Sequence, residues 1–208
     1  MMNIELTSIK IPKTPKGIKT FDAILSAASR LICEKGYATI TTNHVANLAN
    51  VNIASLYKYF PNKNAIILTI SERRNQIFYN LCLDLGESLA LGQPWEKLLE
   101  AFFDRYERML KESHISCAIS AAMRADPQLR TVYQDQLNYR LSPLVEALTQ
   151  RFGLSPDLAF TLAATTIEAG CGLIDIPILN PGLDDGRWLP EAKSLAIRYL
   201  SPYFAAES

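Results

Sequence analysis

The chain has 208 residues, of which 21 are basic and 21 acidic, so its formal net charge is zero. A composition of 49% hydrophobic and 20% charged residues is typical of a globular protein with a substantial core and excludes a disordered chain. No stretch approaches the about 18 uncharged apolar residues of a membrane span. The lysine-rich first 20 residues lack the apolar region of a secretory signal, so we expect a cytoplasmic protein.

The charge is distributed unevenly along the chain. Residues 1–75 contain ten basic and four acidic side chains, a net charge of +6, and the remainder carries −6. A basic segment joined to an acidic body suggests a module that binds polyanions and a second part that does not. Chance clustering on a solvated surface explains the charge pattern alone equally well.

The residue types needed for metal or covalent chemistry are sparse. Four cysteines are widely spaced and only His44 and His114 accompany them, which excludes a CxxC zinc pattern and a disulfide framework. We expect reduced, buried thiols, no metal and no cofactor. HExxH, a serine elbow, a Walker loop and GxGxxG are also missing from the sequence, so an enzyme is not predicted.

The first 60 residues are predicted to form three helices. Apolar residues recur at helical spacing from Gly17 to Lys35, and Gly36 ends this amphipathic helix. A short second helix follows an N-cap at Thr41 or Thr42. Its end is set by Asn50, because asparagine tolerates the left-handed conformation of a tight turn.

The third helix follows a cap at Asn52 and runs to about Phe60. At 100° per residue, its inward side is apolar and consists of Ile53, Leu56 and Phe60. Its outward side and flanks carry small, hydroxylated and cationic residues, namely Ala54, Ser55, Tyr57 and Lys58. The second and third helices therefore have the lengths and surface chemistry of a helix-turn-helix, whose second helix enters the major groove.

The rest of the chain also follows the helical period, which predicts an all-α protein. Further helices are expected over residues 63–85, 94–110, 113–123, 126–148, 155–172 and 189–204, with a loop over 180–186. About nine helices result. Gly86 and Gly92 are expected to loosen the chain after the first of these, and Pro143 to kink or split the fourth.

The stretch from Ile24 to about Ile70 resembles the tetracycline-repressor (TetR) family of bacterial transcriptional regulators. The matching features are Ala27-Ala28, Gly36-Tyr37, Thr41-Thr42, Val45-Ala46, Ala49, Val51, Leu56-Tyr57, Tyr59-Phe60 and Lys63. Asn50, Asn52 and Ala54 depart from the usual pattern but keep the backbone chemistry that their positions require.

The resemblance implies a homeodomain-like DNA-binding head over residues 1–65. Residues at or near operator DNA would be Thr42, Asn43, Ile53, Ala54, Ser55, Tyr57, Lys58, Tyr59 and Lys63. Those nearest base edges would be Ile53, Ala54, Ser55 and Lys58. Those holding phosphates would be Thr42, Tyr57 and Lys63.

The resemblance further implies a ligand-binding and dimerisation domain over residues 66–208, a helical bundle whose last two helices form a homodimer interface. Small residues from Leu158 to Gly172 suit close helix packing, although packing within one subunit explains them too. Candidate ligand residues are Trp95, Phe102, Phe103, Tyr106, His114, Cys117, Met123, Tyr133 and Glu168. Aromatic residues at helical spacing are also typical of a core.

The sequence therefore predicts a regulator that binds specific double-stranded DNA and is released by a small apolar or aromatic effector, most simply a repressor. One alternative is a helical ligand-binding or adaptor protein whose head no longer binds DNA. Another is a thiol sensor of oxidants acting through Cys117 or Cys171, which lacks an evident cationic neighbour to lower a thiol pKa.

Overall fold

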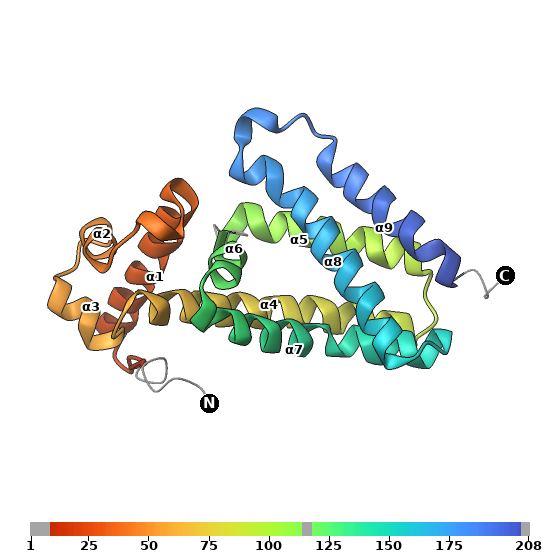
Figure 1. The fold of residues 1–208 in the computed structure, drawn as a ribbon, viewed down its shortest axis with the longest axis horizontal. Helices are drawn as coiled ribbons and strands as arrows, with labels where there is room; N and C mark the ends of the chain where they lie inside the picture. The colour runs from red at the N-terminus through yellow and green to blue at the C-terminus, as the bar shows by residue number, and fades with distance from the viewer. Residues whose placement is uncertain (1–8, 114–117, 205–208) are drawn as a thin grey trace. The chain divides into compact units, whose positions relative to one another are not determined.

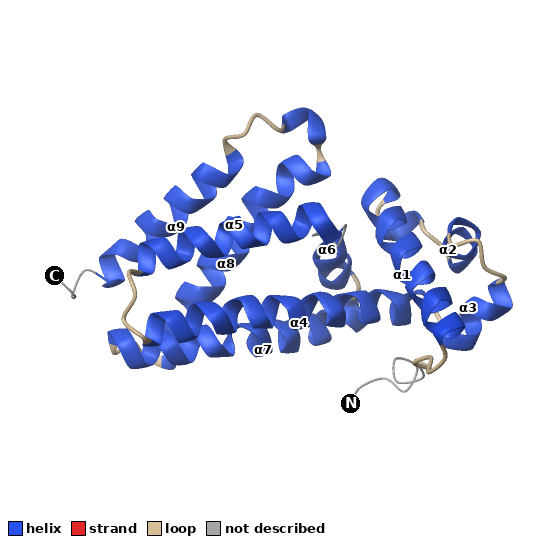
Figure 2. Ribbon diagram, turned by 180° about the vertical axis from the view of Figure 1, so that it is seen from behind, coloured by secondary structure: helices blue, strands red, loops and turns tan. Residues whose placement is uncertain are grey.

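The computed structural model describes residues 9–113 and 118–204. These residues form α-helices and two short 3-10 turns with no strand, which confirms the all-α prediction (Figure 1 and Figure 2). The nine α-helices in this part of the chain are α1 (Pro15–Lys35), α2 (Thr42–Leu48), α3 (Ile53–Tyr59), α4 (Lys63–Ala90), α5 (Trp95–Ser113), α6 (Ala118–Ala125), α7 (Pro127–Phe152), α8 (Pro156–Leu179) and α9 (Trp188–Phe204). The 3-10 turns are η2 (Tyr37–Thr39) and η3 (Pro181–Leu183).

The helix-turn-helix begins and ends where its capping residues predict. Thr41 Oγ1 accepts a hydrogen bond from the His44 amide at 3.2 Å, which caps α2. Asn52 Oδ1 accepts one from the Ala54 amide at 2.8 Å, which caps α3. Between the two helices Asn50 has φ of 53°, the left-handed conformation expected of it.

Helix α4 runs through Gly86 and ends at Ala90, before Gly92. Gly86 is buried, and a Cβ added to it would lie 2.8 Å from the carbonyl oxygen of Pro143 in α7. The glycine therefore serves close packing of two helices instead of ending one. α7 is also continuous through Pro143 and is not split there.

The predicted end of α8 near Gly172 is wrong. The helix runs through Gly172 and Pro177 to Leu179, and Ile174 within this last part is buried. Glycine in a helix costs about 1 kcal/mol relative to alanine, which tertiary burial readily offsets.

The chain divides into two compact units. Unit 1 comprises residues 1–74 and 114–134, and unit 2 comprises residues 75–113 and 135–208. The core of unit 1 is formed by α1, α2, α3 and the start of α4, together with Ile119, Met123 and Leu129 from α6 and α7. A compact unit is not a functional domain, so the division at residue 65 stays a prediction.

Unit 2 has a separate core formed by α5, α8, α9 and the adjoining parts of α4 and α7. α8 and α9 lie side by side, as Figure 1 shows. A Cβ on Gly170 of α8 would collide with the ring of Phe103, so this glycine allows α8 and α5 to approach closely.

By length and apolar composition, α8 could cross a membrane, and among the described residues it alone meets that test. It nevertheless carries Glu168 and Asp175, and its apolar residues Leu162 and Ile167 are buried in unit 2. Because a helix in the core of a protein has the same apolar composition, the burial of these residues accounts for the composition of α8.

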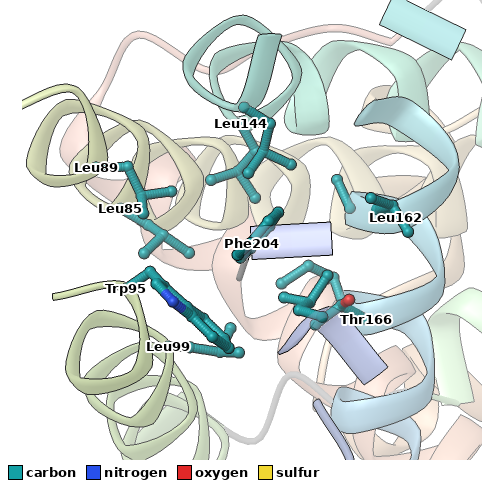
Figure 3. Close-up of a pocket in the computed structure, with 12 residues that line it drawn as sticks. Leu85, Leu89, Trp95, Leu99, Leu144, Leu162, Thr166 and Phe204 are labelled. Atoms are coloured by element: carbon teal, nitrogen blue, oxygen red, sulfur yellow. The ribbon is translucent and has the colours of Figure 1, made fainter. Parts of the chain in front are cut away.

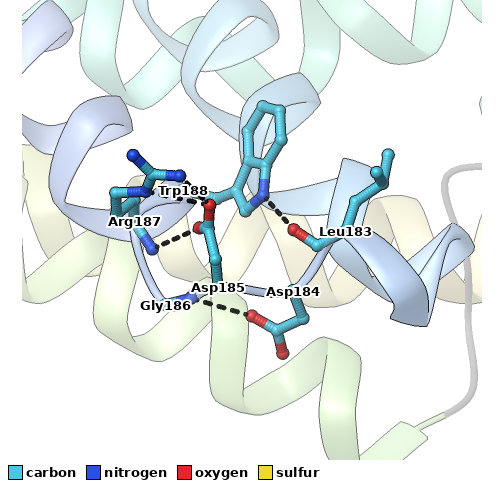
Figure 4. Close-up of polar contacts among 6 residues, drawn as sticks. All are labelled: Leu183, Asp184, Asp185, Gly186, Arg187 and Trp188. Carbon is cyan, nitrogen blue, oxygen red and sulfur yellow. Dashed lines mark hydrogen bonds and ion pairs between the residues drawn. The ribbon is translucent and has the colours of Figure 1, made fainter.

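The loop before α9 is held by its own polar contacts (Figure 4). The Asp185 carboxylate accepts hydrogen bonds from the Arg187 amide at 3.0 Å and from its guanidinium at 2.9 and 2.5 Å. Trp188 Nε1 donates to the Leu183 carbonyl at 2.8 Å. These contacts fix the entry into α9, which begins one residue before the predicted start.

The cysteines are not all buried as predicted. Cys82 and Cys171 are buried, whereas Cys33 is exposed, and Cys117 lies outside the described residues. Burial raises the pKa of the Cys82 thiol to about 12 despite the opposing charge of Arg140, so Cys82 is protonated at neutral pH. Within the described ranges, no three His, Cys, Asp or Glu side chains gather at a point suited to a metal ion.

Candidate nucleic-acid interface

Helix α3 presents one face to the core of unit 1 and the other to solvent. Leu56 and Phe60 are fully buried, and the Phe60 ring packs on Phe21 with a centroid separation of 4.6 Å. Ala54 and Lys58 are exposed, as the helical wheel predicts. The outward face therefore combines a small residue, which permits close approach, with a cation.

Hydroxyl groups gather beside this face. Thr42 Oγ1 and the Tyr57 hydroxyl lie 2.9 Å apart, so α2 and α3 present them together. Tyr57 is 51% exposed, Asn43 is exposed, and Ser55 is half-buried. We call the exposed outward side of α3, which carries Ala54 and Lys58, together with the adjoining Thr42 and Tyr57, the α3 face.

Two predicted DNA-binding residues are less accessible than expected. The side chain of Tyr59 is buried, with its ring packed edge-on against Phe21 at a centroid distance of 5.8 Å. The Lys58 ammonium lies 5.6 Å from the centre of the Tyr59 ring, so Tyr59 supports Lys58 instead of facing outward. Ile53 is half-buried and packs against the core. The wheel predicts inward packing for Ile53, whereas the burial of Tyr59 depends on contacts from α1.

Lys63, at the start of α4, is held by a residue that the sequence analysis did not single out for function. Its Nζ donates to the Tyr37 carbonyl at 3.0 Å and lies 4.0 Å from the centre of the Tyr37 ring. This cation–π contact favours one position of the ammonium. In the sequence, Tyr37 stands out only as part of the Gly36-Tyr37 pair that resembles the TetR family. That pair does not indicate that Tyr37 contacts Lys63.

The other end of Tyr37 contacts the residue before α7. Its hydroxyl lies 2.7 Å from Asp126 Oδ2, and the other carboxylate oxygen of Asp126 accepts from the Gln128 amide at 2.9 Å, which caps α7. Burial, followed by the hydrogen bond to Asp126 and its charge, raises the pKa of Tyr37. Burial acts to raise the pKa of Asp126, but hydrogen bonds from Tyr37, Gln128 and Asn64 outweigh it and lower that pKa.

Unit 2 contains an apolar cavity with a volume of about 40 Å³, partly open to solvent (Figure 3). Its walls are almost entirely hydrocarbon, from Leu85, Leu89, Trp95, Leu99, Leu144, Leu148, Leu162, Ala163, Thr166, Ile167, Leu200 and Phe204. No charged side chain lines it. The Thr166 hydroxyl is buried there without a hydrogen-bond partner. An unpartnered hydroxyl carries a desolvation cost that a bound polar group would remove.

Of the predicted ligand residues that the structure describes, Trp95 lines this cavity and the others do not. Buried in unit 2 are Phe102, Phe103 and Tyr106, and buried in unit 1 are Met123 and Tyr133. Glu168 forms an ion pair with Arg140, and Tyr106 donates to Asp175 at 2.9 Å. His114 and Cys117 lie outside the described residues. The leucines that line the cavity were missed because leucine at helical spacing is indistinguishable from ordinary core.

Comparisons with known proteins agree with this architecture. Residues 24–70 match the family described as bacterial regulatory proteins, tetR family. An uncharacterized HTH-type transcriptional regulator, YdeS of Bacillus subtilis (strain 168), is 43% identical over 54 residues. That match covers 26% of this chain and spans only 27% of the length of YdeS.

Solved structures extend the likeness in fold to most of the chain. The fatty acid degradation regulator FadR from Bacillus halodurans has a TM-score of 0.70 at 18% identity, covering 91% of this chain and 97% of its own. A transcriptional regulator (TerR/AcrR family) from Aquifex aeolicus VF5 has a TM-score of 0.62 at 23% identity, with coverages of 89% and 99%. SmeT, the repressor of the Stenotrophomonas maltophilia multidrug efflux pump SmeDEF, has a TM-score of 0.60 at 20% identity, with coverages of 88% and 91%.

The short capped helices α2 and α3, the turn at Asn50 and the exposed α3 face define a helix-turn-helix protein. The N-terminal segment matches the model of the bacterial regulatory proteins, tetR family, and most of the chain shares its fold with the solved structures named above.

Proposed function

We propose that this protein is a transcriptional regulator that binds specific double-stranded DNA through the α3 face. The observation that carries the proposal is the two-sided character of α3, with Leu56 and Phe60 fully buried and Ala54 and Lys58 exposed. Base edges would be read by Ala54, Ser55 and Lys58, and phosphates bound by Thr42, Tyr57 and Lys63. The protein would act in the cytoplasm as a binding protein, not as an enzyme.

The proposed regulator is a homodimer that pairs through α8 and α9. Both helices carry exposed apolar side chains, among them Leu158 and Leu179 on α8 and Leu195 and Tyr203 on α9. An exposed apolar face of this kind supports association with a second copy. Two heads would then reach successive major grooves about 34 Å apart on a roughly palindromic site.

A repressor role is supported by the descriptions of SmeT and of NalD from Pseudomonas aeruginosa, both called repressors of multidrug efflux pumps. We propose that a small uncharged effector binds in unit 2 and favours a state with lower DNA affinity. Such control needs only a difference of about 1–3 kcal/mol in the effector's affinity for the two states.

Operator selection from genomic fragments, followed by a salt titration, tests the DNA-binding proposal. Wild type is expected to select a roughly palindromic site. Lys63→Ala should weaken binding to every duplex by about tenfold and reduce the salt slope by about 0.9, since one phosphate contact is lost. Lys58→Ala or Ser55→Ala should instead change the preferred sequence.

Equal affinity for all duplexes, or no binding at 100 mM salt (roughly physiological strength), contradicts specific recognition. If the protein binds an effector but shifts no genomic fragment in an electrophoretic mobility assay, the result supports the alternative of a ligand-binding or adaptor protein. If treatment with peroxide leaves DNA binding unchanged, the protein is not a thiol sensor that controls DNA binding.

The cavity makes a separate prediction about the effector. Because its walls hold no charge and burying a charge costs several kcal/mol, 1-alkanols should raise the thermal midpoint of the full-length protein and the matching carboxylates should not. Ala163→Leu, which fills the cavity, should abolish the shift. Ala101→Leu is the matched control at an exposed position of α5, outside the proposed dimer interface, and should retain it. Equal shifts by alkanols and carboxylates would place the ligand elsewhere.

A further inference from the structure

One tyrosine connects three segments of unit 1 that are distant in sequence. The backbone carbonyl and ring of Tyr37, in η2, hold the Lys63 ammonium at 3.0 Å and 4.0 Å respectively. Its hydroxyl lies 2.7 Å from Asp126 Oδ2, 89 positions along the chain. The position of the lysine is therefore tied, through Tyr37, to Asp126, the residue that caps α7.

The proton of the Tyr37 hydroxyl has two acceptors within reach, Asp126 Oδ2 and Asn64 Oδ1, the latter at 2.6 Å. A carboxylate is the stronger acceptor, so we assign the proton to Asp126. The Asn64 amide donates to Asp126 at 3.3 Å and to Gln128 at 3.2 Å. Asp126 is thus fixed from several sides and can hold the tyrosine in one rotamer.

We infer that Tyr37 and Asp126 are positioning residues for Lys63 in DNA binding, an inference that rests on the proposed function. An ammonium has three donors, and the Tyr37 carbonyl takes one, which leaves two for a phosphate. A lysine that is already held in place loses less rotamer freedom when it binds. The bond between the Tyr37 hydroxyl and Asp126 therefore strengthens binding without touching the duplex.

A double-mutant cycle on the full-length protein tests this. Tyr37→Phe keeps the ring and the carbonyl that contact Lys63 but removes the bond to Asp126. We expect about threefold weaker binding to both the selected operator and an unrelated duplex. In the Lys63→Ala background the same change should alter affinity by less than about 1.5-fold, because the two residues act through one contact.

Two further variants separate positioning from a general loss of stability. Asp126→Asn keeps a good helix cap but replaces the charged acceptor of the Tyr37 hydroxyl with a neutral amide, so it should weaken DNA binding less than Tyr37→Phe does, with no additional loss in the double variant. Tyr139→Phe removes a hydroxyl from an exposed tyrosine of unit 2 and should leave DNA affinity unchanged.

The outcomes distinguish the inference from the proposed function. An equal loss from Tyr37→Phe with and without Lys63, or no loss at all, overturns the inference while DNA binding stands. A wild-type protein that binds no duplex overturns both.

Discussion

Replacing Phe60 with alanine is expected to lower the free energy of unfolding by about 3–5 kcal/mol, the range for a buried phenylalanine. Phe60 is fully buried, packs against Phe21 and holds the end of α3 on the core of unit 1. Its loss leaves a cavity beneath the helix that we propose enters the groove. Specific DNA binding should therefore fail together with stability.

Urea denaturation followed by circular dichroism measures this effect, and hydrogen exchange of the α1–α3 amides locates it. Tyr57→Ala is the matched control, because it removes an aromatic ring from the same helix at a position that is 51% exposed. We expect it to change the free energy of unfolding by less than about 0.5 kcal/mol while weakening DNA binding. A cost below about 1 kcal/mol for Phe60→Ala would show that α3 is not anchored as described.

The second large effect is expected from Glu168→Gln, which removes the negative partner of Arg140 without changing the shape of the side chain. The Arg140 side chain is 7% exposed and Glu168 is 33% exposed. Because the buried guanidinium would lose the charge of this partner, unfolding should require about 2–4 kcal/mol less free energy. Thermal and urea denaturation of the full-length protein measure the change.

An exposed ion pair of the same unit provides the comparison. Arg105 and Asp84 form a 2.7 Å pair in which both side chains are about half exposed. Asp84→Asn should therefore cost no more than about 1 kcal/mol. If the two substitutions have equal effects, burial does not determine the strength of the Arg140 pair, and the described packing of α7 against α8 is wrong at this point.

Short-range sequence patterns account for the local features of the DNA-binding head. Capping by Thr41 and Asn52 and the left-handed Asn50 involve residues at most three positions apart, so their pattern is visible in the chain. The inward packing of Leu56 and Phe60 follows from helical period alone. These features were sufficient to predict the helix-turn-helix and its outward face.

Contacts between distant residues depend on how the helices pack. Tyr37 contacts Asp126, and leucines from several helices surround the cavity of unit 2, because helices pack in an order that no local spacing specifies. Packing also extended α4 past Gly86 and α8 past Gly172, where burial and close helix contact outweigh the low helix propensity of glycine. Capping residues a few positions apart determine where the short helices begin and end. The lengths of the long helices, the lining of the cavity and the contact between Tyr37 and Lys63 instead depend on burial among residues far apart in the sequence.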